Sequence, residues 1–205
     1  MGSETRGRVL HAARSYDLLA WLLLLGRERA FRDRLVQLAR IQPGEAVLDI
    51  GCGTGSLAIA AKQHAGASGV VHGIDASPEM IARAEKKARK AGVDVTFRTA
   101  IAEALPFQER QFDVVLSTLM LHHLPRETRQ QTAHEIRRVL KPGGRVLAVD
   151  FGRSSAERKG LLSHLHRHGR VAMPDIVALL EAAGFEIVET GAVGMLDLDF
   201  VLGRA

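Results

Sequence analysis

Short apolar runs alternate with amphipathic stretches along most of the chain. The apolar runs have the length of strands and are rich in Val, Ile and Leu, whereas the amphipathic stretches repeat their apolar residues at helical spacing. The expected strands cover residues 46–50, 70–75, 93–99, 112–117, 145–151, 186–189 and 196–202, and the expected helices cover 56–64, 78–91, 127–139 and 174–183. This alternation of continuously apolar strands with helices predicts a mostly parallel sheet with helices on both faces.

The segment of residues 16–40 precedes this alternation and has a different pattern. Leucines at positions 18, 19, 22 and 25, and then Phe31, Leu35 and Leu38, recur at helical spacing, with arginines among the other positions. The sheet does not need this segment to complete its β–α alternation. We therefore expect a single domain over residues 1–205, in which residues 16–40 form a helical lid that orders over the crevice when ligands bind.

Composition and charge narrow the class of protein. A chain of 205 residues with 46% hydrophobic and 25% charged residues predicts one globular domain. A single cysteine excludes an internal disulfide framework. The apolar run Leu18–Leu25 is too short to span a bilayer and no secretory signal is visible, so we expect a cytoplasmic protein without a transmembrane segment. The net charge of +5 is spread over helical positions and aromatic residues make up only 4%, which favours solvated helix faces over a nucleic-acid interface.

The strongest local signal is the run Val47-Leu-Asp-Ile-Gly-Cys-Gly-Thr-Gly55. It places Gly51, Gly53 and Gly55 at alternate positions between a strand and a helix, just after Asp49. Glycines let a ligand approach the backbone, and helix N-terminal amides favour a carboxylate or phosphate. Ser56 stands where a dinucleotide fingerprint has its third glycine, so the spacing does not indicate NAD. The alternative interpretation is a tight turn without a ligand.

Asp75 ends the second expected strand, about 20 residues after the glycine run, where an acid meets ribose hydroxyls in nucleotide-binding α/β proteins. Its carboxylate could accept hydrogen bonds from a ribose diol. The sequence Asp-Ala-Ser-Pro is equally suited to begin a helix, so a capping role is the alternative.

Histidines gather after the fourth and fifth strands. His122 and His123 stand where the crevice of a parallel sheet opens, and imidazole titrates near neutral pH, so either could act as a general base. Alternatively, one packs against the fold and the other faces solvent. His164, His166 and His168 have no nearby acid or cysteine ligand, so we expect a basic substrate-side segment and no metal site.

Five motifs in this chain resemble the ordered motifs of class I methyltransferases that use S-adenosylmethionine (SAM). They are Leu48-Asp-Ile-Gly-Cys-Gly-Thr-Gly, Gly73-Ile-Asp-Ala-Ser-Pro-Glu-Met, Ala102-Glu-Ala-Leu-Pro-Phe, Phe112-Asp-Val-Val and Leu140-Lys-Pro-Gly-Gly. The greatest likeness is to the small-molecule group that includes the ubiquinone/menaquinone-type C-methyltransferases. The resemblance implies a Rossmann-like fold with a seven-stranded sheet whose last strand is antiparallel, SAM as cofactor, and a small-molecule acceptor, with an apolar one as an option.

The resemblance also implies roles for particular residues. The segment Asp49–Gly55 would hold the methionine portion of SAM, and Asp75 would bind the ribose diol. The adenine would pack on Ala76 and Met80 and receive a hydrogen bond from the backbone amide of Ala102. The expected cofactor-binding set is Asp49, Gly51, Gly53, Gly55, Asp75, Ala76, Met80, Ala102 and Ser117, the last of which would line the methionine end.

Two comparisons within the superfamily refine these expectations. Phosphobase methyltransferases carry a histidine that matches His123 and pair it with a tyrosine for which Tyr16 is the counterpart, so we expect His123 and Tyr16 to be catalytic. Those enzymes have an acid where this chain has Leu119, which argues against their substrate. Ile101 replaces an aspartate that commonly accepts a hydrogen bond from the adenine amino group, which predicts SAM binding weaker by roughly tenfold.

Two other functions stay open on the sequence alone. An RNA or protein methyltransferase could use the basic residues, although the chain has no appended binding domain and no Asn/Asp-Pro-Pro-Tyr motif after the fourth strand. A non-catalytic SAM-binding protein is the third reading, since Ile101 relaxes the cofactor contacts. The motifs specify the cofactor and not the acceptor.

Overall fold

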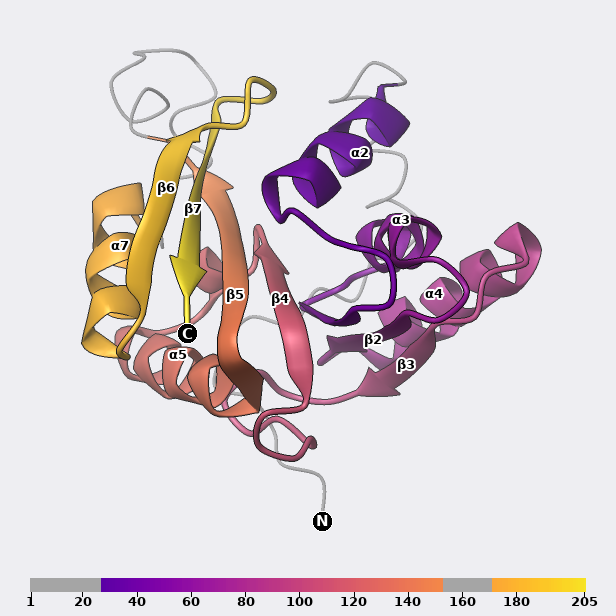
Figure 1. The fold of residues 1–205 in the computed structure, drawn as a ribbon, viewed down its shortest axis with the longest axis horizontal. Coiled ribbons are helices and arrows are strands. Elements are labelled where there is room, and N and C mark those ends of the chain that lie inside the picture. The colour runs from indigo at the N-terminus through magenta and orange to yellow at the C-terminus, as the bar shows by residue number, and fades with distance from the viewer. Residues whose placement is uncertain (1–26, 153–170) are drawn as a thin grey trace.

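The computed structural model describes residues 27–152 and 171–205, and their strands form a seven-stranded sheet in the order β3-β2-β1-β4-β5-β7-β6 (Figure 1). The strands are β1 (Ala46–Ile50), β2 (Val70–Asp75), β3 (Thr96–Thr99), β4 (Phe112–Thr118), β5 (Leu140–Phe151), β6 (Glu186–Ala192) and β7 (Leu198–Arg204). The helices are α2 (Glu28–Leu38), α3 (Ser56–Ala65), α4 (Pro78–Ala91), α5 (Arg126–Val139) and α7 (Met173–Ala182), with a short helical turn η1 (Leu121–His123).

Strand directions confirm the predicted fold class. Strands β1 to β5 pair in parallel, whereas β7 runs antiparallel to both β5 and β6. The chain reverses its direction of progress across the sheet between β1 and β4, which are neighbours. In an open α/β sheet, ligands bind at such a point, outside the carboxyl ends of the strands.

Local chemistry explains where the elements begin and end. Helix α4 begins after Ser77, whose hydroxyl accepts a hydrogen bond from the Met80 amide at 3.3 Å, and ends at Gly92 in a left-handed conformation. The Val93 amide then donates to the Ala88 carbonyl at 3.1 Å. Because Val93 closes the helix, β3 begins only at Thr96, three residues later than the sequence predicts.

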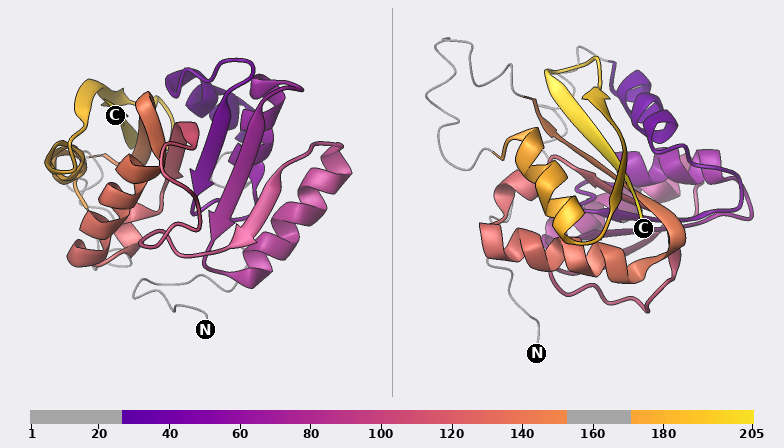
Figure 2. Two further views of the ribbon diagram at one scale, coloured as in Figure 1. Left: turned by 60° about the horizontal axis from the view of Figure 1, so that its bottom comes forward. Right: turned by 60° about the vertical axis from the view of Figure 1, so that its left-hand side comes forward.

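Two apolar clusters lie on opposite faces of the sheet. Alternate residues of each central strand supply them, so that Val47 and Leu116 face one cluster while Leu48 and Val115 face the other. Helices α2, α3 and α4 lie on one side and α5 and α7 on the other, as Figures 1 and 2 show. Among the described helices, none is long and apolar enough to cross a membrane.

Helix α2 is packed into the hydrophobic core in this structure. Its residues Phe31, Leu35 and Val36 are at most 1% exposed and belong to the cluster that α3 and the central strands share. The lid over residues 16–40 stays a prediction, and in this structure the apolar face of residues 28–38 is buried in the core. Residues 16–26, with Tyr16, lie outside the described part of the chain, and a lid role for them stays a prediction.

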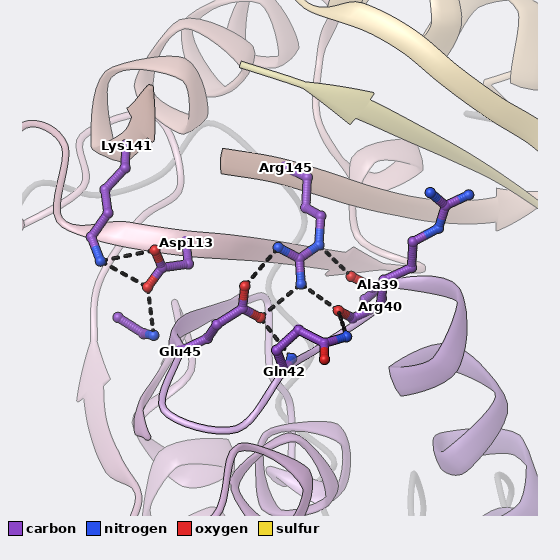
Figure 3. A network of polar contacts seen from close by, with 8 residues as sticks. Ala39, Arg40, Gln42, Glu45, Asp113, Lys141 and Arg145 are labelled. Atoms are coloured by element: carbon purple, nitrogen blue, oxygen red, sulfur yellow. Dashed lines mark hydrogen bonds and ion pairs between the residues drawn. The ribbon is translucent and has the colours of Figure 1, made fainter. Parts of the chain in front are cut away.

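A polar network at the amino ends of the strands holds the end of α2 (Figure 3). The Arg145 guanidinium donates to the carbonyls of Ala39 and Arg40, each at 2.6 Å, and forms a bidentate pair with Glu45 at 2.9 and 2.7 Å. These carbonyls follow the last turn of α2, whose final carbonyl groups lack partners within the helix. Arg145 thus joins β5 to α2, at the end of the sheet opposite the crevice.

Candidate functional site

The predicted site residues that the structure describes meet at the carboxyl ends of β1, β2 and β4. The glycine run follows β1, Asp75 ends β2, and Ser117 lies opposite Ile50 in the parallel pair of β1 and β4. These segments are far apart in the sequence, and the sheet brings them to one edge.

The three glycines of the run all have left-handed backbone conformations, with φ of +68° at Gly51, +53° at Gly53 and +79° at Gly55. Neighbouring side chains also restrict two of them. A Cβ on Gly51 would lie 2.5 Å from Met120 Cγ, and one on Gly55 would lie 2.7 Å from the Phe97 ring. Tight turning and close side-chain contact therefore explain part of the glycine pattern that the sequence alone attributes mainly to a ligand.

Asp75 holds the backbone of the glycine run through a hydrogen bond. Its Oδ2 accepts a hydrogen bond from the Gly53 amide and its Oδ1 accepts one from the Ser77 amide, both at 2.9 Å. Ser77, and not Asp75, caps α4. Burial raises the pKa of Asp75 above its usual value, and the two amides act against that rise. Each carboxylate oxygen has a second lone pair, so Asp75 can also accept hydrogen bonds from a diol.

The residues expected around the adenine border the same edge. Met80 is buried in the first turn of α4, Ala76 is half-buried, and Ala102 is 9% exposed in the segment between β3 and β4. The Ala100 amide donates to the Asp75 carbonyl at 3.0 Å, which ties the start of that segment to the end of β2. Ile101 lies beside Ala102 and offers no hydrogen-bonding side chain there.

Asp49 lies at the end of β1 and is 2% exposed, and its Oδ2 has no hydrogen-bond partner among the described residues. Burial raises the pKa of Asp49 to about 7, which Arg32 and a hydrogen bond from the Ala58 amide oppose and Asp75 reinforces. Arg32 comes from α2 and its Nε is also buried without a partner in the described part of the chain. The sequence analysis missed Arg32, because the helical pattern of α2 gave no sign of which arginine faces the sheet.

Two hydroxyls near the end of β4 are likewise without partners. Within the described ranges, neither Ser117 Oγ nor Thr118 Oγ1 makes a hydrogen bond, although both atoms are buried. Because side chains alternate along a strand, Thr118 points toward the α2 side, as Asp49 does, and Ser117 points toward the α5 side. Buried polar atoms without partners are costly and are uncommon in a finished core. Their concentration at this edge indicates a binding site for a polar ligand.

His122 and Asp150 form a polar pair near the carboxyl ends of β4 and β5. His122 Nδ1 lies 2.9 Å from Asp150 Oδ1, and the His122 amide donates to Asp150 Oδ2 at 3.2 Å. Asp150 is 1% exposed at the end of β5, and its Oδ1 also accepts from the Phe151 amide at 2.9 Å. The sequence analysis named both histidines and preferred His123, but it missed Asp150.

Of the two predicted catalytic residues, His123 lies within the described part of the chain. The His123 ring stacks on the His122 ring with centroids 3.9 Å apart, and the His123 amide donates to the Met120 carbonyl at 3.0 Å. Tyr16 lies outside the described residues, so the predicted pair of Tyr16 and His123 stays untested.

Known proteins similar to this chain include methyltransferases. Residues 47–144 match the methyltransferase domain family. A demethylmenaquinone methyltransferase of Thermus thermophilus is 39% identical over 136 residues, which is 66% of this chain and 60% of the relative. A ubiquinone/menaquinone biosynthesis C-methyltransferase of Blochmanniella floridana is 33% identical over 156 residues, which is 75% of this chain and 61% of the relative. The chain thus spans about three fifths of the length of these two relatives.

Solved structures show the same fold. A SAM-dependent methyltransferase from Aquifex aeolicus superposes with a TM-score of 0.74 at 22% identity, over 94% of this chain and 96% of that one. Residues 47–144 therefore match a methyltransferase domain, and the fold of the chain is that of a class of SAM-dependent methyltransferases. Within the class, its sequence resembles the ubiquinone/menaquinone-type C-methyltransferases.

Proposed function

We propose that the protein transfers a methyl group from SAM to a small apolar aromatic acceptor that must lose a proton, such as a quinol, with His122 as the base. The observation that carries this proposal is the pair of His122 and buried Asp150 at the crevice. The names of the quinone methyltransferases to which the chain is similar support the acceptor class. A cytoplasmic location and the absence of a nucleic-acid partner are part of the same proposal.

The residues at the edge of the sheet suit the parts of SAM. The partnerless atoms of Arg32, Asp49 and Thr118 match an amino-acid end, in which Arg32 would hold the carboxylate and the two oxygens would hold the ammonium. Asp75 would hold the ribose diol, and Ala76, Met80 and Ala102 would border the adenine. The backbones of Gly51, Gly53 and Gly55 would let the cofactor approach, with Ser117 near its methionine end. When bound, SAM supplies a methyl group on a positively charged sulfur.

The contact with Asp150 defines what His122 can do. A carboxylate accepts hydrogen bonds, so Nδ1 of His122 carries the hydrogen and Nε2 is left with its lone pair. Nε2 can therefore take the proton of an acceptor hydroxyl, and Asp150 stabilises the imidazolium that results. A carbon or oxygen atom of the acceptor would take the methyl group as its hydroxyl proton passes to His122, and the electron pair of the broken bond would stay on the sulfur of the donor.

The surroundings of His122 favour an aromatic acceptor. Its ring contacts that of His123 and also that of Phe151, whose centroid is 5.2 Å away in an edge-to-face arrangement. Aromatic rings attract one another in such geometries, so an aromatic acceptor would find favourable contacts beside the base. Met120 and Leu121 add apolar surface next to it.

The test is a methyl-transfer assay with labelled SAM and a panel of reduced quinols, phenols and pooled metabolites. We expect His122→Gln to lower kcat by about 100-fold or more, because general-base catalysis commonly contributes that much. Asp150→Asn should lower kcat as well, since the amide group can favour the wrong tautomer of His122.

His123→Gln is the matched control, because it changes the same ring one position away. A large loss in His123→Gln with full activity in His122→Gln would replace the proposal with the pair of Tyr16 and His123. Transfer to RNA or protein substrates and to no small molecule would support a macromolecular methyltransferase. SAM binding without transfer to any acceptor in the panel would support a non-catalytic SAM-binding protein.

A further inference from the structure

The segment between β3 and β4 has no regular secondary structure, yet it carries Ala102. Irregular backbone needs hydrogen-bond partners outside the regular ladders. At its start, the Ala100 amide is held by the Asp75 carbonyl at 3.0 Å. At its end, the amides of Arg110 and Gln111 donate to carbonyls at the end of α5, at 2.9 and 2.8 Å.

Two side chains of α5 hold the middle of this segment. The Leu105 amide donates to Glu135 Oε2 at 2.8 Å, and the Leu105 carbonyl accepts from Arg138 Nη2 at 3.1 Å. Arg138 Nη1 also donates to the Phe107 carbonyl at 2.9 Å. A pair of charged side chains on a helix thus satisfies three backbone groups of an irregular segment.

The pair itself is well fixed. Arg138 Nε and Nη2 donate to the two carboxylate oxygens of Glu135 at 2.6 and 2.7 Å, so the contact is bidentate. The two side chains are 30% and 21% exposed. Their helix is anchored through Ile136 and Val139, which are at most 1% exposed. Glu135 and Arg138 therefore fix the backbone of residues 105–107 relative to α5.

Ala102 lies between the anchor at Asp75 and the anchor at Leu105. Because Ile101 cannot accept a hydrogen bond from an adenine, recognition of the ring falls on main-chain groups such as the Ala102 amide. The direction of a main-chain amide is set by whatever holds its segment. Small errors of position weaken a hydrogen bond steeply, so the anchors should matter for adenine affinity.

We propose that Glu135 and Arg138 are positioning residues for adenine recognition, which hold residues 105–107 and thereby aim the Ala102 amide at the cofactor ring. This inference rests on the proposed use of SAM at this edge. The pair lies on α5 and acts through the backbone of the segment, so it would touch neither the cofactor nor the acceptor.

The test compares two ligands by calorimetry: S-adenosylhomocysteine and its hypoxanthine analogue, in which ring atom N1 carries a hydrogen and cannot accept one. We expect wild type to prefer the adenine ligand. Arg138→Met replaces arginine with another good helix former. It removes the hydrogen bonds to the Leu105 and Phe107 carbonyls and the pairing with Glu135. It should weaken the adenine ligand by about tenfold, the equivalent of one or two lost hydrogen bonds, and leave the analogue almost unchanged. In turnover, KM for SAM should rise more than kcat falls.

Arg137→Met is the matched control. Arg137 is the preceding residue of α5, and its guanidinium lies 5.9 Å from the Phe185 ring centroid, on the side of α7. It should keep the wild-type preference between the two ligands. Glu135→Gln serves as a second variant if Arg138→Met unfolds, and Arg138→Lys should restore only part of the preference because an ammonium lacks the planar fork.

Two results would overturn the inference. One is an unchanged preference in both Arg138→Met and Glu135→Gln, and the other is an equal loss of affinity for the two ligands. If wild type binds neither ligand, the proposed cofactor site fails instead, and the two failures are thus distinguishable.

Discussion

At the scale of single residues, the site concentrates buried polar groups that the fold does not satisfy. The carboxylate of Asp49 is held by one amide and repelled by Asp75, and one of its oxygens has no partner in the described part of the chain. An unsatisfied buried group costs about 1–3 kcal/mol, a cost that a stable core normally avoids. A bound ammonium would remove that cost. The free protein is thus strained in the place where binding relieves the strain.

SAM affinity should depend on the protonation of Asp49. With its pKa raised to about 7, Asp49 is mostly neutral below that pH in the free protein, whereas a bound ammonium requires the ionised form. Affinity should therefore rise by up to about tenfold per pH unit between roughly pH 5.5 and 7, because binding releases a proton. Calorimetry in buffers of different ionisation enthalpy measures both the affinity and the released proton.

Asp49→Asn is the control for this pH effect, and it should bind SAM weakly with an almost flat dependence on pH. A wild-type affinity that does not change over this range would contradict the assignment. The same shift affects stability with a defined sign. The folded protein holds a proton that the unfolded chain, with a pKa near 3.8, has lost, so the free energy of unfolding without ligand should fall as pH rises from about 4 to about 7.

At the scale of elements, α2 decides how much of the N-terminal region can move. Its apolar face is buried with α3 and its last carbonyls are held by Arg145, so it has to stay docked for Arg32 to face Asp49. An element that supplies part of a binding site is more precise when packing holds it. Any movement that admits ligands would then belong to other segments than α2.

Hydrogen exchange can separate a docked helix from a lid. We expect residues 28–38 to be protected to the same degree with and without S-adenosylhomocysteine, since core packing and not the ligand holds them. Arg145→Met should reduce their protection, because the change leaves Glu45 and two carbonyls without this partner, at a cost of about 1–3 kcal/mol.

Arg204→Met is the control for Arg145→Met. Arg204 lies opposite Arg145 in the pairing of β5 with β7, and its guanidinium makes an exposed contact with Glu186 at 3.9 Å. Such exposed pairs contribute little to stability, so protection of α2 should not change. If residues 28–38 are protected from hydrogen exchange only when ligand is bound, the result would support the prediction that the whole of residues 16–40 is a lid.

At the scale of the whole molecule, the site lies where the chain reverses its direction of progress across the sheet, between β1 and β4. The residues proposed for the cofactor come from α2, the first turn of α4, the ends of strands and the loops after them. A ligand that bridges these parts binds the folded state alone and so stabilises the whole protein.

Thermal unfolding should show which cofactor the crevice accepts. At about 100 times its Kd, S-adenosylhomocysteine should add about 2.7 kcal/mol and raise Tm by roughly 5–10 °C, whereas NAD should have no effect. Gly53→Val should abolish this rise, because a valine side chain at position 53 would occupy space that the cofactor needs. The Gly53 amide lies at the proposed ribose site, where it donates to Asp75. Stabilisation by NAD and none by S-adenosylhomocysteine would overturn the assignment of the cofactor.

Gly92→Val is the control for backbone strain in that experiment. Gly92 has a φ of +65°, similar to the +53° of Gly53, and open space where a Cβ would stand. The variant should unfold at a lower temperature than wild type but keep the full rise with ligand. If Gly92→Val also shows no rise of Tm with S-adenosylhomocysteine, then backbone strain, and not a blocked cofactor site, explains the loss of that rise in Gly53→Val.

The sequence by itself determined the elements and the glycine run, because both depend on local chemistry. Apolar periodicity gave the exact bounds of β1, β2 and α4, and the alternation of elements with the family motifs gave the parallel sheet with its antiparallel last strand. The place of Asp75 at a strand end followed from the same pattern. These features need only the neighbours along the chain.

The tertiary structure alone decided which distant side chains meet. Asp150 reaches His122 across 28 positions, and Arg145 reaches Ala39 across 106, because adjacent strands and helices put them side by side. In the same way, packing determined that Arg32, among the arginines of α2, lies near Asp49. It also placed Glu135 and Arg138 against residues 105–107. Periodicity shows that a residue faces the core or the crevice, but the partner it finds there depends on the packing of the whole chain.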